Sequence, residues 1–122
     1  KEMIQAKTPK LILQPIVENS IMHGFLGKKS HGSLRIRELQ KKDKMVITIT
    51  DNGCGIPSEE LRRIMAGERR KSYHGGGFGL RNIDERIKLA FGESYGLRVR
   101  SKYGIGTQVS IFLPLDERGE LP

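Results

Sequence analysis

The glycine residues of this chain gather at three places, and this clustering limits the possible folds more than any other feature of the sequence. Of the 15 glycines, eight fall in three short clusters. These clusters are Gly53 and Gly55; Gly75, Gly76, Gly77 and Gly79; and Gly104 and Gly106. Glycine serves where the backbone takes a positive φ or where another group must approach the main chain closely. We therefore expect special turns or close backbone contacts at these three positions.

Helices are predicted on both sides of the first two clusters. Apolar residues recur at helical spacing in Lys10–Gly24 and again in Leu80–Phe91. Gly92 is expected to end the second of these helices. Ser58 as an N-cap and Gly67 as a stop signal predict a further short helix between them.

Strands are predicted in two pairs, each joined by a short link. Alternation and β-branched content predict them at Leu34–Leu39, Lys44–Asp51, Tyr95–Ser101 and Thr107–Leu113. Hairpins rather than parallel crossovers favour one α/β domain whose sheet is mixed or mostly antiparallel, with helices on one face. Residues 67–78 carry no hydrophobic period and are expected to form a mobile loop, and the polar tail after Leu115 is expected to fray.

Length and composition exclude several classes of protein. The 122 residues allow a single domain, taken as 1–122. No apolar run approaches the roughly 18 residues of a membrane-spanning helix, and no segment resembles a signal peptide, so a soluble, cytoplasmic domain is expected. The single Cys54 excludes an internal disulfide. The net charge of +8 fits either a solvated basic surface or a polyanionic partner.

Polar residues interrupt the apolar first helix. Glu18, Asn19 and His23 lie in its middle, and Asn19 and His23 share one flank because they are four residues apart. A surface helix could carry these residues without any function. The alternative is that they face a ligand.

A second polar feature follows the predicted strand that ends near residue 50. The segment Ile49–Pro57 runs from this strand into Asp51 and then into two glycines separated by one residue. Asp-Asn-Gly is a good turn sequence, which accounts for the segment without any ligand. The functional interpretation is that Asp51 is a fixed acceptor for an exocyclic amine such as that of adenine, with a flat ring against the glycines.

The longest glycine run, residues 75–79, directly precedes a predicted helix. Free N–H groups and the positive end of the helix dipole suit phosphate at such a position. The run is neither a dinucleotide-binding fingerprint nor a Walker loop, because no close parallel strand precedes it and no Gly-Lys-Ser/Thr follows. Alone it is a weak signal.

Together and in this order, the three features resemble the N, G1 and G2 boxes of the GHKL ATPases. The turn Gly104–Thr107 is similar to the last glycine box of that superfamily. The sequences of three segments, Pro9–Gly24, Asp51–Pro57 and Gly77–Gly92, look most like those of the catalytic domains of LytS/YesM-like sensor histidine kinases. The resemblance spans about residues 9–114.

The resemblance implies a Bergerat-type α/β two-layer sandwich that holds Mg²⁺-ATP beneath a flexible lid. It implies that Asn19 ligates Mg²⁺, that Asp51 binds the adenine amino group, and that Thr107 lies near the adenine. The residues that it places at ATP are Asn19, His23, Asp51, Gly53, Gly55, Ile56, Gly75, Gly77, Gly79, Leu80 and Thr107. Glu18 and Asn19 are the candidate catalytic residues.

The chain departs from the family pattern near Asn19. Many relatives carry an acid or amide four residues before this Asn, where this chain has Pro15, and its acid is the adjacent Glu18. Where related kinases often carry Lys, this chain has Met22. A phosphate contact is then either lost or supplied by His23, by Arg81, or by Arg69, Arg70 and Lys71 of the expected lid. A neutral imidazole acceptor needs less help from a general base than water does. The lack of an acid at the usual position therefore favours a kinase over an ATPase.

No histidine of this chain lies in a long dimerisation helix, so the phosphate acceptor is expected elsewhere. The resemblance then implies a catalytic domain excised from a longer, homodimeric, membrane-bound sensor kinase. An upstream dimerisation and phosphoacceptor domain would be its partner, with a response regulator acting after it. Two alternatives stay open, a stand-alone GHKL serine kinase that acts as an anti-sigma switch, and a basic nucleic-acid-binding domain, although no nucleic-acid partner is expected.

Overall fold

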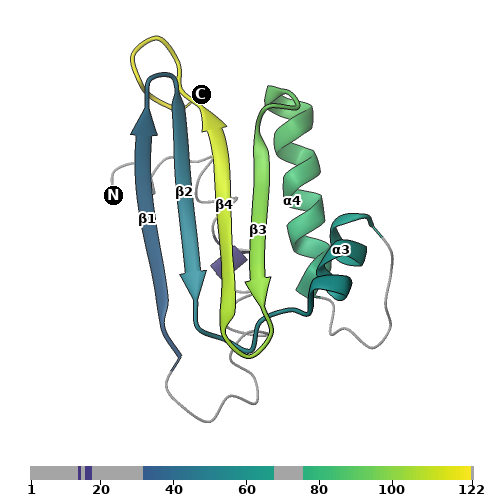
Figure 1. The fold of residues 1–122 in the computed structure, drawn as a ribbon. Helices are drawn as coiled ribbons and strands as arrows, with labels where there is room; N and C mark the ends of the chain where they lie inside the picture. Colours follow the sequence, from purple (N-terminus) through teal and green to yellow (C-terminus); the bar gives the residue numbers. More distant parts are fainter. Residues whose placement is uncertain (1–13, 15, 18–31, 68–75, 122) are drawn as a thin grey trace.

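The computed structural model describes residues 14, 16–17, 32–67 and 76–121, and Figure 1 traces them from purple to yellow. Gln14, Ile16 and Val17 are helical, as predicted for that part of the first helix. The other elements are β1 (Leu34–Lys41), β2 (Lys44–Asp51), α3 (Ser58–Met65), α4 (Gly76–Phe91), β3 (Gly96–Lys102) and β4 (Gly106–Pro114). None of the helices in these ranges has the length and apolar content that crossing a membrane requires.

The four strands form one sheet in the order β1-β2-β4-β3. Every strand pair among the described residues is antiparallel, so the sheet is more regular than the mixed arrangement that the sequence left open. The last of the described strands, β4, lies between β2 and β3 in the interior of the sheet. The ends of β2 and β3 and the start of β4 consequently meet at one end of the sheet (Figure 1).

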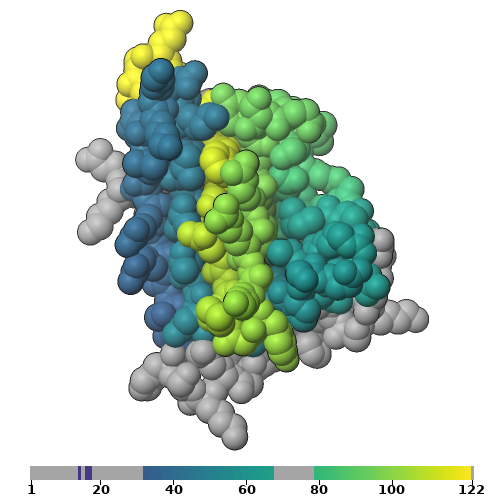
Figure 2. All heavy atoms as spheres, in the orientation of Figure 1, coloured from purple at the N-terminus to yellow at the C-terminus, as the bar shows by residue number. Residues whose placement is uncertain are grey.

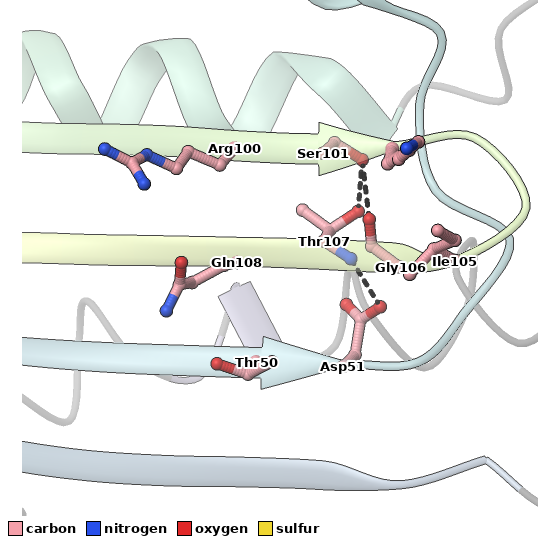
Figure 3. Close-up of a pocket in the computed structure, with 9 residues that line it drawn as sticks. Thr50, Asp51, Arg100, Ser101, Ile105, Gly106, Thr107 and Gln108 are labelled. Carbon is pink, nitrogen blue, oxygen red and sulfur yellow. Dashed lines mark hydrogen bonds between the residues drawn. The ribbon is translucent and has the colours of Figure 1, made fainter.

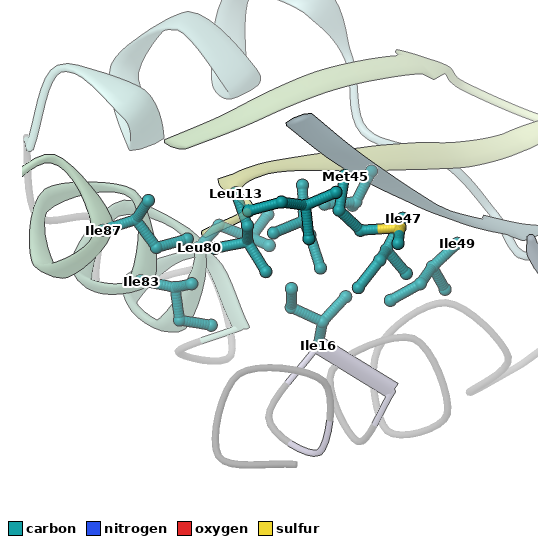
Figure 4. Packing of buried hydrophobic residues seen from close by; sticks show 11 residues of the cluster. Ile16, Met45, Ile47, Ile49, Leu80, Ile83, Ile87 and Leu113 are labelled. Atoms are coloured by element: carbon teal, nitrogen blue, oxygen red, sulfur yellow. The ribbon is translucent and has the colours of Figure 1, made fainter. Parts of the chain in front are cut away.

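One face of the sheet is covered by helices, as predicted. Side chains alternate along β2, and Met45, Ile47 and Ile49 are buried on the covered face. They pack with residues of β4, with three residues of α4 and with Ile16 of the first helical segment, as Figure 4 shows. The residues from α4 are Leu80, Ile83 and Ile87. This cluster is the hydrophobic core, and it joins the helices to the centre of the sheet.

The sequence prediction for helix α3 is wrong at the start of the helix and right at its end. Its N-cap is Pro57 and no side chain caps it, so the prediction that Ser58 is the N-cap is wrong, and Ser58 is the first helical residue. The prediction for the other end is confirmed. Gly67 follows the helix with φ +89°, and its N–H donates to the carbonyl of Ile64.

Helix α4 starts earlier than hydrophobic spacing indicated. It begins at Gly76, so residues 76–78 belong to a helix and not to the predicted loop, and residues 68–75 lie outside the described residues. Three of the first four positions are glycine, which has little helix propensity, so the sequence gives no helical signal there. Gly92 ends the helix with φ +109°, as predicted, and its N–H bonds the carbonyl of Lys88.

The described residues after β4 form a hydrogen-bonded turn, so the prediction that this tail frays is wrong. Leu115 is buried, and its N–H donates to the carbonyl of Asp43. The carboxylate of Asp116 accepts hydrogen bonds from the backbone N–H groups of Arg118 and Glu120, both at 2.9 Å. The hydrogen bond from the Glu120 N–H is the main reason that the pKa of Asp116 lies below its ordinary value, and the backbone N–H and guanidinium of Arg118 lower this pKa further. This turn was missed because its residues are polar and carry no hydrophobic period.

Asp84 fastens helix α4 to strand β3. Its Oδ1 accepts a hydrogen bond of 2.8 Å from the Leu97 N–H and another of 2.9 Å from Lys88 Nζ. Lys88 Nζ in turn donates to the carbonyl of Tyr95 at 2.9 Å. Gly96 fits beneath this pair, because a Cβ there would lie 2.4 Å from both Asp84 Oδ1 and Lys88 Nζ.

We expect Asp84→Ala to lower the free energy of unfolding by about 1–2 kcal/mol, because the Leu97 N–H and the Lys88 ammonium lose a partly buried acceptor. Urea denaturation measures the change. The matched control is Glu85→Ala, one position along the helix, where only an exposed ion pair with Arg81 is lost and the expected cost is about 0.5 kcal/mol or less. Equal costs for the two variants would contradict this role of Asp84.

Candidate functional site

The centre of the candidate site is the carboxylate of Asp51, the last residue of β2. Only 8% of Asp51 is exposed. Its Oδ1 accepts a hydrogen bond of 2.9 Å from the N–H of Gly53 and one of 3.2 Å from the N–H of Thr107. Figure 3 shows the carboxylate lying against the start of β4. The side chain thus holds together the turn after β2 and the first residues of β4.

The second oxygen of the Asp51 carboxylate, Oδ2, differs from Oδ1 in its hydrogen bonding. No hydrogen bond joins Oδ2 of Asp51 to any part of the chain that the structure describes, and this atom is not sealed from solvent. A carboxylate oxygen is an acceptor only. Asp51 therefore offers one fixed, unoccupied acceptor at the end of a central strand.

Hydroxyl groups extend this arrangement across the sheet. In the strand register Thr107 lies opposite both Asp51 and Ser101, so the three residues form one row across β2, β4 and β3. Ser101 Oγ lies 2.8 Å from Thr107 Oγ1 and donates to the carbonyl of Gly106 at 3.0 Å. Because a hydroxyl has a single proton, the Thr107 hydroxyl must then donate to Ser101. The row is a continuous chain of oriented polar groups.

Ser101 also holds the segment that follows Asp51. Its Oγ accepts a hydrogen bond of 2.7 Å from the N–H of Ile56, whose side chain is buried. In the same region the N–H of Gly104 donates to the carbonyl of Cys54 at 2.6 Å. The turn after β2 is therefore attached to the β3–β4 hairpin at two points. Sequence reasoning missed Ser101, since a lone serine in a strand becomes informative only when its register with Thr107 is known.

Two glycines of the clusters allow these close contacts. Gly55 has φ +77°, and a Cβ at this position would lie 2.1 Å from the carbonyl oxygen of Lys102. Gly106 has φ +152°, and a Cβ there would lie 2.1 Å from the carbonyl oxygen of Asp51. The expectation of close backbone contacts is confirmed at these two positions.

A cavity of about 280 Å³ opens at this end of the sheet (Figure 3). Its lining residues are Thr50, Asp51, Arg100, Ser101, Lys102, Ile105, Gly106, Thr107 and Gln108. Thr50, Arg100 and Gln108 alternate with the core residues of their strands, so their side chains belong to the face opposite the helices. The cavity is thus lined both by side chains of the uncovered face and by the polar row of Asp51, Thr107 and Ser101.

The structure brings together five of the residues selected from the sequence, Asp51, Gly53, Gly55, Ile56 and Thr107. Gly77 and Gly79 lie in the first turn of α4. Leu80 lies in the hydrophobic core with 1% of its surface exposed, and its contact with a nucleotide stays a prediction. The remaining selected residues, Glu18, Asn19, His23 and Gly75, lie outside the described residues.

Comparison with known proteins gives consistent results. Residues 5–117 match the family described as histidine kinase-, DNA gyrase B-, and HSP90-like ATPase. The sensor histidine kinase YesM of Bacillus subtilis (strain 168) is 41% identical over 106 residues, which cover 87% of this chain and 17% of that protein. The sensor histidine kinase YpdA of Escherichia coli (strain K12) is 33% identical over 113 residues, covering 93% and 19% respectively. The chain thus spans less than a fifth of the length of these relatives.

Solved structures agree on the fold. The catalytic domain of histidine kinase ThkA, in a nucleotide-free form, superimposes with a TM-score of 0.65 at 19% identity, over 86% of this chain and 64% of that chain. The histidine kinase domain from the blue-light activated kinase of Erythrobacter litoralis gives a TM-score of 0.60 at 21% identity, over 89% and 44% respectively. The sandwich with an antiparallel sheet is therefore the fold of histidine kinase catalytic domains. From the matched residues 5–117 and this fold, the chain belongs to the family of histidine kinase-, DNA gyrase B-, and HSP90-like ATPases.

Proposed function

We propose that the chain binds Mg²⁺-ATP and, as the catalytic domain of a sensor histidine kinase, transfers the γ-phosphoryl group to a histidine outside its 122 residues. The observation that carries the proposal is the difference between the two carboxylate oxygens of Asp51. One oxygen is fixed by two N–H groups, and the other is available to a ligand. The family match over residues 5–117 supports it.

The free Asp51 oxygen selects adenine by hydrogen-bond direction. Adenine carries an amino group at C6, which donates to the carboxylate, whereas guanine carries an acceptor oxygen there, which the carboxylate repels. The buried Ile56 is attached through its N–H to Ser101 in the same polar row, and Thr107, whose N–H bonds Asp51, supplies a hydroxyl beside the carboxylate. Gly53 carries no side chain, which lets a flat ring approach the backbone beside Asp51, whereas Gly55 makes room for the Lys102 carbonyl and so holds the turn in place.

The phosphates are proposed to lie at the start of α4. The first turn of this helix contains Gly77 and Gly79 and no acidic residue, so its N–H groups and its dipole favour an anion. Gly75 and His23 are proposed as further contacts. Asn19 is proposed to hold Mg²⁺, since an amide oxygen is a suitable ligand for this hard cation.

In the proposed transfer, a lone pair of the acceptor imidazole forms a bond to the γ-phosphorus. The bond from this phosphorus to the β–γ bridging oxygen breaks, and ADP leaves with that electron pair. The imidazole then loses the proton of its other ring nitrogen. Glu18 is proposed to accept this proton, directly or through a water molecule.

The wider setting is proposed from the relatives. YesM and YpdA are named as sensor histidine kinases, which favours this function over the alternative of a stand-alone serine kinase. The acceptor is then proposed on a dimerisation helix of a homodimeric, membrane-bound parent protein whose catalytic domain faces the cytoplasm. A response regulator would receive the phosphoryl group from that histidine.

Thermal shift measurements test the proposal directly. We expect ATP and ADP with Mg²⁺ to raise the Tm of the chain and GTP to have little effect. Ligand at 100 times its Kd contributes about 2.7 kcal/mol to the free energy of unfolding. No shift with millimolar Mg²⁺-ATP or Mg²⁺-ADP, or an equal shift with GTP, would overturn the proposal.

The role of Asn19 is tested by the metal dependence of binding. We expect Asn19→Ala to remove most of the gain that Mg²⁺ gives to ATP affinity, and to leave ATP binding in EDTA nearly unchanged, because only the metal ligand is lost. Titration calorimetry with and without Mg²⁺ separates the two contributions. Equal weakening in Mg²⁺ and in EDTA would contradict a role in holding the metal.

A further inference from the structure

The face of the sheet opposite the helices, which we call the open face, has an ordered pattern of side chains. Figure 2 shows the strands at the front of the molecule, with no other described element over them. By strand alternation and register, the side chains of this face are Arg35, Arg37, Leu39, Lys41, Lys44, Val46, Thr48, Thr50, Arg98, Arg100, Lys102, Gln108, Ser110, Phe112 and Pro114. None of them takes part in the proposed nucleotide contacts.

Two cross-strand rows on this face have the same design. One row runs Arg35, Thr50, Gln108, Arg100 from β1 to β3. The other runs Arg37, Thr48, Ser110, Arg98. In both rows an arginine stands at each end and uncharged hydrogen-bonding groups lie between. Neighbouring strands are about 4.8 Å apart and alternate residues about 7 Å apart, so the four arginines mark a rectangle of roughly 14 by 7 Å.

The open face is strongly basic. Its cations are Arg35, Arg37, Lys41, Lys44, Arg98, Arg100 and Lys102, and the four strands contribute no carboxylate to it. The only acidic residues of the strands, Glu38 and Asp51, lie on the opposite face, because they alternate with the open-face residues. The four arginines are exposed, and none forms an ion pair within the described part of the chain. Such a surface attracts an anionic partner.

The composition of the face distinguishes among anionic partners. Single-stranded nucleic acids are bound on aromatic stacking platforms, whereas the one aromatic ring here, Phe112, is covered by the Arg98 guanidinium at 5.2 Å. A membrane surface calls for several apolar anchors, whereas the centre of the rows holds Thr, Ser and Gln. Hydroxyl and amide groups between arginines match carboxylates and peptide groups, which accept hydrogen bonds from both.

We propose that the open face is a docking surface for an Asp/Glu-rich polypeptide segment, separate from the nucleotide site. Carboxylates of the segment pair with the arginines at the ends of the rows, and its backbone crosses the hydroxyl groups between them. This proposal goes beyond the proposed function and does not depend on it.

Binding to a labelled peptide in which glutamate alternates with serine tests the proposal on the whole 122-residue chain. We expect saturable binding in fluorescence anisotropy at low salt, which weakens as salt is raised. Arg35→Gln/Arg100→Gln is expected to weaken it about tenfold, since each exposed ion pair gives roughly a threefold gain in affinity. The control Arg86→Gln/Arg118→Gln removes the same charge from other surfaces and is expected to change affinity by less than about twofold.

The other partner classes are arms of the same experiment. Equal losses in the two double variants, or no saturable binding of the peptide, would overturn the docking surface. Tighter binding of an oligonucleotide or of anionic phosphatidylglycerol vesicles through Arg35 and Arg100 would replace the polypeptide as the occupant. The thermal shift with Mg²⁺-ATP is measured in parallel. If Arg35→Gln/Arg100→Gln keeps this thermal shift, its loss of peptide binding is due to the open face and is independent of the nucleotide proposal.

Discussion

Asp51→Asn is expected to reduce ATP affinity by at least about 100-fold while the domain stays folded. The N–H groups of Gly53 and Thr107 require an acceptor, so the amide oxygen of the new side chain takes the place of Oδ1. The amide nitrogen is then left at the position of the free oxygen. In the proposed complex, two donors, this nitrogen and the adenine amino group, then face each other.

The same reasoning predicts a change in base preference. Because the amide nitrogen can donate to the C6 oxygen of guanine, Asp51→Asn should lower the ratio of ATP affinity to GTP affinity. Calorimetric titration with both nucleotides measures this ratio, and the Tm without ligand reports on the fold. Asp43→Asn, in the β1–β2 turn at the other end of the sheet, is the charge-matched control. Unchanged ATP affinity in folded Asp51→Asn would remove Asp51 from the base contact.

Gly55→Ala is expected to lower the free energy of unfolding by about 3 kcal/mol. An alanine at φ +77° costs about 1–2 kcal/mol in backbone conformation. Its Cβ would also lie 2.1 Å from the backbone carbonyl oxygen of Lys102, and relieving such overpacking costs about 1–3 kcal/mol more. Since the obstacle is backbone and not the end of a flexible side chain, the turn after β2 must move away from β3.

Gly104→Ala separates the two contributions. Gly104 has a similar φ of +89°, but no atom lies within 4 Å of the position its Cβ would take. We therefore expect about 1–2 kcal/mol, from backbone conformation alone. Urea denaturation of both variants measures the difference. A Gly55→Ala variant no less stable than Gly104→Ala would show that the turn can be displaced from β3 without cost.

Much of the fold could be predicted from local patterns, because the strands have a strong signal. Met45, Ile47 and Ile49 alternate with polar or β-branched residues, and this pattern located β2 to the residue. The start of α4 could not be found in this way. The glycines at positions 76, 77 and 79 have poor helix propensity, so hydrophobic spacing becomes visible only at Leu80.

The candidate site was predicted only in part, because the register between its strands could not be predicted from the sequence. Asp51, Gly53, Gly55, Ile56 and Thr107 were selected by resemblance to a family, and they do lie together. Ser101 was not selected, although it contacts both Ile56 and Thr107. Its importance depends on which residue of β4 lies opposite it, and side-chain alternation alone does not determine the pairing of two strands.

The order of the strands has a consequence for the time at which the site forms during synthesis. The contact between Asp51 and Thr107 joins residues 56 positions apart, and that between Ile56 and Ser101 joins residues 45 positions apart. Because β4 follows the other three described strands and lies between β2 and β3, the Asp51 carboxylate has no second backbone donor until residue 107 has left the ribosome. A nascent chain that lacks β4 consequently holds this carboxylate through the Gly53 N–H alone.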